Sequence, residues 1–290
     1  MTRFLALSAQ VDGSADHDFA VQAELARLFE RGRFDAVFVT GTAAAGEPLS
    51  VLSALSTVTS HIGLVGTAGT TDHEPYHLAR KFASLDHLSH GRAGWHADPG
   101  PDHGRAAEFT DVVRQLWDSF SDRAVVRDVA GARYYDPDQL RAPEHRGEHF
   151  RVRGPLNISR PPQGHPVLFV TDAPGTFAAR HGEVFRTADP DAGIKARVAA
   201  AGRDPGQVRV WLSLPPLAGT PERIADRLQE WFTSGAADGF TVSFPELPGP
   251  AVDFVRQVVP ILRRRGLVPD GYHGRTLREN LGLARPEVSR

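Results

Sequence analysis

Threonine and histidine residues follow several short apolar runs in this chain of 290 residues. A hydroxyl group can donate and accept hydrogen bonds, and an imidazole ring can also transfer a proton near neutral pH. Side chains of this kind at strand ends could bind a polar cofactor ring or carry out acid–base chemistry. The positions that share this pattern are Thr40, Thr67, His96, His103 and Thr171, and Gly175 ends the polar turn after the last of them.

A second candidate site is the segment His73–His77, which reads His-Glu-Pro-Tyr-His and matches a short zinc-binding signature. That signature binds zinc only when both histidines lie one turn apart on the same helix. Pro75 suits the first turn of a helix rather than its interior, which places His73 before the helix. The spacing shows no third ligand, so we predict no metal site here.

The stretch 47–96 must position these residues, and it reads as helix, strand, loop, helix and strand. Leu52, Leu55 and Val58 share one face of a helix that opens at Glu47-Pro48. A second helix begins at Pro75 and runs toward Gly91, a residue suited to a left-handed stop. Short apolar strands joined by crossover helices of this kind are parallel.

The same alternation continues through the chain and predicts an α/β fold, a (β/α)8 TIM barrel, as one domain spanning residues 1–290. In such barrels the active site is built from the loops after the strands. The predicted strands are 4–9, 34–40, 62–65, 92–96, 167–170, 183–187, 208–214 and 240–244. The predicted helices are 19–31, one opening at 47–48, 75–90, 105–120, 194–201, 221–232 and 251–265.

Two segments depart from this rhythm. Residues 121–165 suggest an irregular excursion, which we expect to be an integral part of the barrel wall. The tail from about residue 269 looks like a C-terminal strap with exposed ends. Neither segment is low in complexity, so neither indicates a domain boundary.

The composition narrows the class of protein. A hydrophobic fraction of 41% is ample for a core, and a net charge of −2 gives no reason to expect nucleic acid or a membrane surface as partner. Cysteine is absent, which excludes disulfides and thiolate metal sites and fits a reducing cytosol. No stretch approaches a membrane span, and the N-terminal apolar run is too short for a signal peptide. We therefore expect a cytoplasmic globular protein.

Several segments resemble the bacterial-luciferase-like flavin monooxygenases, in the branch of nitrilotriacetate and dibenzothiophene-sulfone monooxygenases. The run EPYHLARKFASLDHLSHGRAGW carries the resemblance, and further segments follow in the order of that family: LWDSF, YYDPDQL, HRGEHFRVRGPLNISRPPQG, GTPERIADRLQEWF, GAADGF, VVPILRRRG and TLRENLGL. The resemblance implies a compact luciferase-like barrel, a likeness that covers most of the chain.

The resemblance also implies an oxidoreductase that uses reduced FMN, supplied by a separate flavin reductase, and dioxygen to oxygenate a small organic substrate. It implies a homodimer as well. His96 and His103 are the expected catalytic contacts near the flavin ring, and Thr67 is expected to bond the ring edge. Thr40, Thr171 and Gly175 complete the expected cofactor-binding set.

The chain departs from the family pattern around the expected flavin. Gly69 replaces a serine of the loop after the third strand. The family has a His-x-x-x-Tyr pair after the fourth strand, and this chain keeps only the histidine, as His103. After the fifth strand, Asp172 and Pro174 stand in the turn that holds the FMN phosphate in the family. Two like charges about 4–5 Å apart cost about 3–4 kcal/mol at an effective dielectric constant near 20, so Asp172 is expected to repel a phosphate.

A long stretch between the seventh strand and GTPERIADRLQEWF, which helps cover the substrate in the family, is also missing. These departures keep two alternatives open. The barrel could be a flavin-independent descendant that catalyses a redox-neutral acid–base reaction, such as a cyclisation or isomerisation, through its histidines. Alternatively, the chain could be a non-catalytic partner subunit of a luciferase-like heterodimer.

Overall fold

Eight parallel strands close into a barrel in the structure, a computed structural model that describes residues 4–11, 18–41, 46–172, 176–244 and 246–288. The barrel strands are β1 (Ala6–Gln10), β2 (Ala36–Val39), β3 (Gly63–Gly69), β4 (Ala93–Asp98), β9 (Val167–Thr171), β10 (Val184–Thr187), β11 (Arg209–Leu214) and β12 (Gly239–Val242). Their order around the barrel is β1-β12-β11-β10-β9-β4-β3-β2. The predicted (β/α)8 fold is confirmed.

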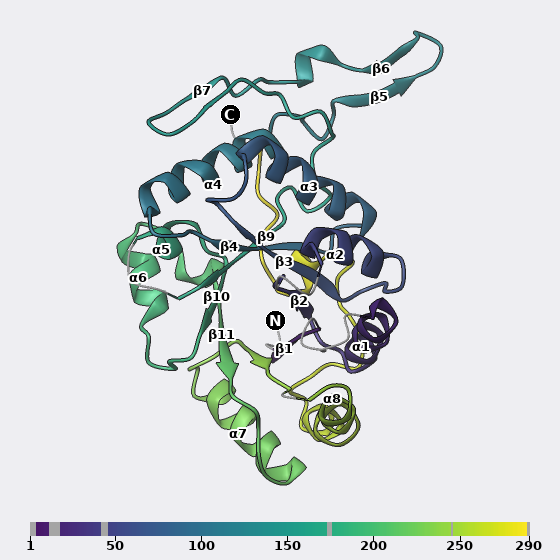
Figure 1. Cartoon of the computed structure of the whole chain (residues 1–290), viewed down its shortest axis with the longest axis vertical. Coiled ribbons are helices and arrows are strands. Elements are labelled where there is room, and N and C mark those ends of the chain that lie inside the picture. Colours follow the sequence, from purple (N-terminus) through teal and green to yellow (C-terminus); the bar gives the residue numbers. More distant parts are fainter. Residues whose placement is uncertain (1–3, 12–17, 42–45, 173–175, 245, 289–290) are drawn as a thin grey trace.

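Helices surround the barrel, and those that precede β12 lie between successive barrel strands in the chain (Figure 1). The helices are α1 (Phe19–Arg31), α2 (Pro48–Ser56), α3 (Pro75–Leu88), α4 (His103–Trp117), α5 (Phe177–His181), α6 (Ile194–Ala200), α7 (Pro221–Thr233), α8 (Gly249–Asp253), α9 (Val259–Arg264) and α10 (Leu277–Asn280). Two three-residue 3-10 helices lie at Pro137–Gln139 and Pro205–Gln207.

Residues at the helix starts explain why the helices begin where they do. Pro48, Pro75 and Pro221 each occupy the first turn, where the missing N–H group has no partner to lose. Asp18 and Asp102 precede α1 and α4, and their side chains accept hydrogen bonds from backbone N–H groups of the first turn. The helix starts predicted at Pro75 and Pro221 are therefore confirmed.

The predicted closing helix 251–265 is observed as α8 and α9 joined by a π-helical turn, Phe254–Val258. Pro260 explains the wider turn, because its ring has no N–H group to donate and crowds the carbonyl group four residues earlier. The helix continues beyond the turn, and its buried residues Val258, Val259 and Leu262 still face the barrel.

Apolar side chains fill the barrel interior as well as the layer between strands and helices. Phe38, Phe169 and Trp211 are fully buried, and the ring of Phe169 lies 5.3 Å from that of Phe38 and 5.5 Å from that of Trp211, centroid to centroid. Gly94 leaves room for this cluster, because a β-carbon there would lie 2.7 Å from the Phe169 ring. The barrel axis is therefore packed rather than open.

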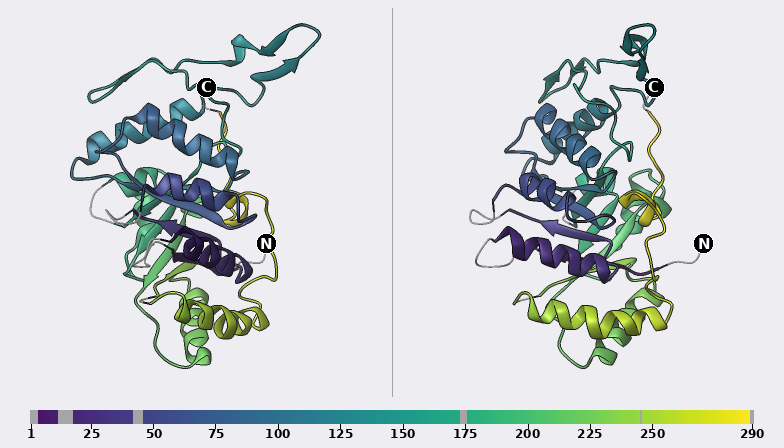
Figure 2. Two further views of the ribbon diagram at one scale, coloured as in Figure 1. Left: turned by 45° about the vertical axis from the view of Figure 1, so that its right-hand side comes forward. Right: turned by 90° about the vertical axis from the view of Figure 1, so that its right-hand side faces the viewer.

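The excursion after α4 lies outside the barrel. It forms two antiparallel hairpins, β5 (Val125–Asp128) with β6 (Arg133–Tyr135) and β7 (His145–Arg146) with β8 (Arg151–Val152). Both hairpins lie beyond α3 and α4, away from the barrel strands (Figures 1 and 2). The expectation that this segment belongs to the barrel wall is wrong, because its strands pair only with each other.

The C-terminal segment runs along one side of the molecule in the right-hand view of Figure 2. Its ends are largely exposed, but Leu277, Leu281 and Leu283 are buried and pack with the residues that fill the barrel. Gly63, the first residue of β3, accommodates Leu277, since a β-carbon there would lie 2.6 Å from a Leu277 methyl group. The sequence did not predict α10, a four-residue helix whose formation depends on this packing.

Polar contacts fix the same segment under the barrel. Arg278 forms an ion pair with Glu183 at 2.7 Å and donates a hydrogen bond to the backbone carbonyl of His165 at 2.9 Å. Arg33 stacks on the Tyr272 ring at 4.0 Å, and the Tyr272 hydroxyl donates to the Phe34 carbonyl at 2.6 Å. The strap therefore closes the end of the barrel at which the strands begin.

Among the described residues, no helix combines the length and the apolar character that a membrane crossing requires.

We predict that Leu277→Ala lowers the free energy of unfolding by about 2–5 kcal/mol, because it opens a cavity under the barrel. Urea unfolding followed by circular dichroism measures this loss. Leu88→Ala is the matched control, since Leu88 is 57% exposed and its truncation should change the free energy by less than about 0.5 kcal/mol. Equal effects of the two substitutions would contradict the proposed closure.

Candidate active site

Alternation along the strands directs a row of polar side chains toward the barrel axis. Successive side chains of a strand point to opposite faces, so Thr40 lies on the same face as the buried interior residue Phe38. By the same rule Thr67, His96 and Thr171 point inward from β3, β4 and β9. The four strands β2, β3, β4 and β9 are consecutive in the barrel, so four predicted site residues meet at its carboxyl-terminal mouth.

His96 is held between two of these threonines. Its Nδ1 lies 3.0 Å from the hydroxyl oxygen of Thr67, and its Nε2 lies 3.0 Å from that of Thr171. In a neutral imidazole one nitrogen donates and the other accepts, so the two hydroxyl groups take opposite roles. The Phe38 ring packs edge-on against the imidazole at 6.0 Å between centroids. Three neighbouring strands thus fix the ring in one orientation.

Burial lowers the pKa of His96 to about 4, and the positive charge of Arg186 contributes to the shift. The carboxylate of Asp98 acts in the opposite direction with a smaller effect. His96 is therefore uncharged at neutral pH. It can donate or accept a hydrogen bond or take up a proton during a reaction, but it cannot supply a resting positive charge.

Thr40, which follows β2, continues the row of inward-facing polar side chains beyond Thr67 of β3. The Gln10 side-chain amide, from the last residue of β1, donates a hydrogen bond to the Thr40 hydroxyl at 2.9 Å. Deeper in the barrel, the Ser8 hydroxyl lies 3.0 Å from the Thr241 hydroxyl. The sequence analysis did not nominate Gln10, although its alternation with Ser8 in a strand could have indicated an inward position.

The two other predicted site residues are not part of this hydrogen-bonded row. His103 is the first residue of α4, so it stands after the loop that follows β4, on the side of the barrel mouth. No contact joins it to His96, Thr67 or Thr171 in the described part of the chain. Gly175 lies outside the described residues.

Arg186 is a site residue that the sequence analysis missed. It is the third residue of β10 and is paired in register with Thr171 of β9. Its guanidinium carbon lies 4.4 Å from the centre of the Phe38 ring, and its Nε is buried without a hydrogen-bond partner. The alternation of Val184 and Arg186 in a barrel strand could have indicated that this cation points inward.

Asp172 does not present an uncompensated charge at the mouth. Its carboxylate forms an ion pair with Arg197 of α6. The expectation that Asp172 alone would repel a phosphate is therefore wrong, because the guanidinium of Arg197 neutralises it locally. Pairing across the loop was not visible in the sequence, where the two residues are 25 positions apart.

The His-Glu-Pro-Tyr-His segment adopts the conformation that argues against zinc binding. Glu74 precedes α3 and Pro75 is its first residue, so only His77 lies within the helix. His73 stays outside the helix, with its Nδ1 3.2 Å from the carbonyl oxygen of Gly69. The described residues contain no group of three or more histidines and carboxylates arranged to hold a metal ion.

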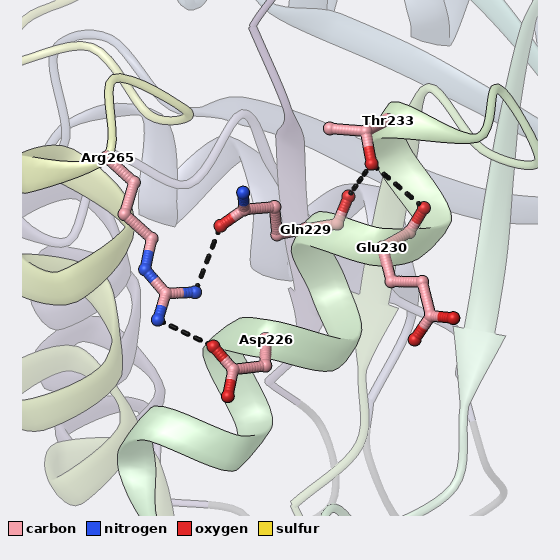
Figure 3. A pocket seen from close by; sticks show the side chains of 5 residues that line it. All are labelled: Asp226, Gln229, Glu230, Thr233 and Arg265. Carbon is pink, nitrogen blue, oxygen red and sulfur yellow. Dashed lines mark hydrogen bonds and ion pairs between the residues drawn. The ribbon is translucent and has the colours of Figure 1, made fainter.

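A surface hollow of about 620 Å³ lies on the outside of the barrel between α7 and the end of α9 (Figure 3). Arg265 donates hydrogen bonds there to Asp226 at 2.6 Å and to Gln229 at 3.0 Å. Arg265, Asp226 and Gln229 therefore bond one another across the hollow, whereas no interaction is drawn for the Glu230 carboxylate (Figure 3). The hollow is remote from the barrel mouth, and its size alone does not make it an active site.

The connection between β11 and α7 is short. It comprises residues 215–220, and five of these six residues are exposed. Because the connection follows the carboxyl end of a barrel strand, it borders the mouth. This side of the mouth therefore has little cover from the chain itself.

Fold and site together define a protein family. The profile of the luciferase-like monooxygenase family matches residues 1–258, and the chain belongs to this family. Its members are flavin-dependent enzymes that act on small organic substrates. They use reduced FMN that a separate reductase supplies. The resemblance to the nitrilotriacetate monooxygenase branch is confirmed.

Individual relatives share most of their length with this chain. It is 41% identical over 269 residues to the B component of pristinamycin IIA synthase from Streptomyces pristinaespiralis, covering 90% of this chain and 88% of the relative. It is 32% identical over 414 residues to nitrilotriacetate monooxygenase component A of Aminobacter aminovorans, covering 94% of this chain and 91% of the relative. The structure of EDTA monooxygenase from Chelativorans sp. BNC1 superposes on this one with a TM-score of 0.86 at 25% identity. The superposition covers 98% of this chain and 99% of that enzyme.

The alignments with these two relatives differ in length, which shows which relative has long insertions. An alignment over 414 residues exceeds the 290 residues of this chain, so the nitrilotriacetate enzyme has long segments that are missing here. The alignment with the synthase component covers 269 residues and requires no such insertions. The compact form of the barrel is therefore shared with that synthase component.

The residues at the mouth fit a flat heterocycle such as the flavin ring. The row of threonine hydroxyls and His96 offers donors and acceptors to ring heteroatoms, and the unpartnered guanidinium of Arg186 offers positive charge. The aromatic cluster beneath them is fully buried and fills the barrel interior. Compensation of Asp172 by Arg197 removes the electrostatic argument for a flavin-independent descendant.

We predict that the pKa of His96 rises when Arg186 is replaced by methionine, because a nearby positive charge no longer opposes protonation. It should stay below the ordinary value, since burial is the larger cause of the shift. Histidine ring NMR between pH 3 and 8 measures this change, with His96→Gln identifying the signal. An unchanged titration in Arg186→Met would contradict the proposed proximity.

Proposed function

We propose that this chain is the oxygenase component of a two-component system, and that reduced FMN from a separate flavin reductase binds at the barrel mouth. The observation that carries the proposal is the neutral His96, held by Thr67 and Thr171 above an apolar barrel interior. Family membership supports the choice of cofactor. The substrate is a small organic molecule, and the whole chain 1–290 acts as one barrel domain.

The side chains at the mouth would take distinct roles. Thr40, Thr67 and Thr171 would hydrogen-bond the edge of the flavin ring, and the polar turn at Gly175 would lie beside its phosphate. His96 would orient the reacting group and hold a proton at a ring nitrogen. His103 would contact the cofactor or substrate from the first turn of α4. The bound flavin supplies the electrons for oxygenation.

The apolar interior supports the same reaction. Phe38, Phe169 and Trp211 are fully buried below the mouth, and Leu277 packs with them from the far end of the barrel. Exclusion of water strengthens hydrogen bonds to a bound ring and protects reactive species from side reactions. The absence of cysteine fits the cytoplasm, where reduced flavin would be supplied.

A second function is favoured by a specific observation. The chain shares its compact form and 41% identity with a protein named as one of the subunits of a synthase. The short connection between β11 and α7 leaves the mouth open on one side. We therefore keep the alternative that this chain is a partner subunit, in which case a longer luciferase-like chain would carry the turnover.

We predict that the purified protein binds reduced FMN with a dissociation constant in the micromolar range. His96→Ala and Thr67→Val should each weaken binding by about three- to thirtyfold, which corresponds to about 0.7–2 kcal/mol for one hydrogen bond. His103→Ala should have a smaller effect, because His103 lies outside the hydrogen-bonded row. Anaerobic titration followed by absorbance and fluorescence measures these constants.

The control for this titration is His61→Ala. His61 precedes β3 and stacks on Tyr272 at 5.1 Å, so it lies at the opposite end of the barrel. Its substitution should leave flavin affinity unchanged. Failure of the wild-type protein to bind FMN at high micromolar concentration would exclude the oxygenase function and favour the partner-subunit alternative.

The hairpin β5–β6 supports the proposal of a dimer. Val129 is 92% exposed at its turn, and Val126, Tyr134 and Tyr135 are exposed on its strands. An isolated two-stranded hairpin has marginal stability in water, and it gains stability by burying an apolar face. We propose that this arm packs against a second luciferase-like chain, either a copy of this chain in a homodimer or a longer relative.

We predict that the double substitution Val129→Asp and Tyr134→Asp shifts the protein from dimer to monomer, because a charge buried in an interface without a partner is costly. Sedimentation at several protein concentrations measures the change. Leu88→Asp is the control, as Leu88 is an exposed apolar residue on α3 rather than on the hairpin. A wild-type protein that remains monomeric at all concentrations would exclude the homodimer.

A further inference from the structure

Arg186 presents a positive charge inside the barrel mouth, and no carboxylate of the described residues forms an ion pair with it. Burial lowers the pKa of its guanidinium, and no neighbouring carboxylate raises it. Its Nε is buried and lacks a hydrogen-bond partner, and no described residue forms an ion pair with its side chain. The Phe38 ring contacts it, with 4.4 Å between the guanidinium carbon and the ring centre.

Two acidic residues at the ends of β9 and β4 have partners other than Arg186. Asp172 follows the residue that pairs with Arg186 across β9 and β10, yet its carboxylate is paired with Arg197. Asp98, at the end of β4, accepts a hydrogen bond from the backbone N–H of Gly100 at 3.0 Å. The described part of the protein therefore supplies no anion to this guanidinium.

A buried charge without a partner is unfavourable, because desolvation is not repaid by a Coulombic attraction. Proteins generally neutralise or pair such groups. A cation that remains unpaired at the mouth of a barrel, where substrates of this fold bind, indicates that a ligand brings the counter-charge. The guanidinium narrows the chemistry of the ligand, since two of its N–H groups can form a planar fork that matches two oxygen atoms.

The neighbours of Arg186 can complete the recognition of such a group. Thr171 is its register partner on β9, and the Thr171 hydroxyl bonds His96. Phe38 contacts both the guanidinium and the imidazole, which places the two polar groups around one aromatic ring. His96 is uncharged and both of its ring nitrogens are bonded to threonine hydroxyls, so the positive charge at this place is that of Arg186.

We propose that Arg186 binds a planar, delocalised oxyanion at the barrel mouth, and that this anion is a carboxylate of the organic substrate. The proposal rests on the proposed function and narrows its substrate class to carboxylic acids. The reduced flavin ring is a second molecule that could bring a delocalised anion to this place. The experiment therefore has one arm for each source.

In the first arm, flavin-free protein is titrated with phenylacetate and with phenylacetamide, two probes of similar shape that differ in charge. Wild-type protein should bind phenylacetate at least about tenfold more tightly, the effect expected of one charge-assisted pair. Arg186→Met should abolish this preference, and Arg186→Lys should retain part of it because the charge is kept. Calorimetry or ligand-observed NMR measures the affinities.

Arg265→Met is the matched control, since it removes an arginine that is paired with Asp226 on the outside of the barrel. It should leave the preference for phenylacetate intact. Arg186→Met should also show a melting temperature no lower than that of wild type, because it removes a half-buried charge that has no ion-pair partner among the described residues. Equal binding of the two probes by wild-type protein, or a preference that survives in Arg186→Met, would overturn the proposal.

In the second arm, the same variants are titrated anaerobically with reduced FMN. Equal flavin affinity in wild type and Arg186→Met, together with loss of the carboxylate preference, supports assignment of the anion to the substrate. A loss of flavin affinity without a carboxylate preference overturns that assignment. If wild-type protein binds no flavin but prefers phenylacetate through Arg186, the anion site stands and the proposed oxygenase function fails.

Discussion

Closure of eight parallel strands around one axis is the constraint on which the rest of this structure depends. Because side chains alternate along each strand, closure brings every second residue of eight separate segments to one place. The lower part of that space is filled by Phe38, Phe169 and Trp211. The apolar packing that stabilises the barrel thereby also forms the dry floor of the site above it.

The site is built from the next inward-facing residues along the same strands. His96 is fixed by Thr67 and Thr171 and is kept neutral by burial and by Arg186. Two roles are therefore divided between two residues. The neutral imidazole of His96 can take up a proton, and the guanidinium of Arg186 carries the permanent charge. Phe38 contacts both side chains and couples their positions to the packed interior.

The chain retains all eight barrel strands but has a short connection after one of them, β11. The connection after β11 is short, whereas the hairpins after α4 extend away from the strands with exposed apolar side chains. The exposed apolar side chains of the β5–β6 hairpin support the proposed association with a second chain. The pairing of Asp172 with Arg197 shows that a departure from the family pattern can be compensated within the structure.

The sequence by itself determined the fold, since apolar strands, proline-initiated helices and their alternation are local signals that a parallel barrel satisfies. It also placed Thr40, Thr67, His96 and Thr171 at strand ends, because that assignment needs only the position of each strand. Only the tertiary structure decided which of these residues touch, that Arg186 has no counter-charge among the described residues, and that Arg197 neutralises Asp172. Those properties depend on contacts between residues distant in sequence, which closure of the barrel creates and no local pattern encodes.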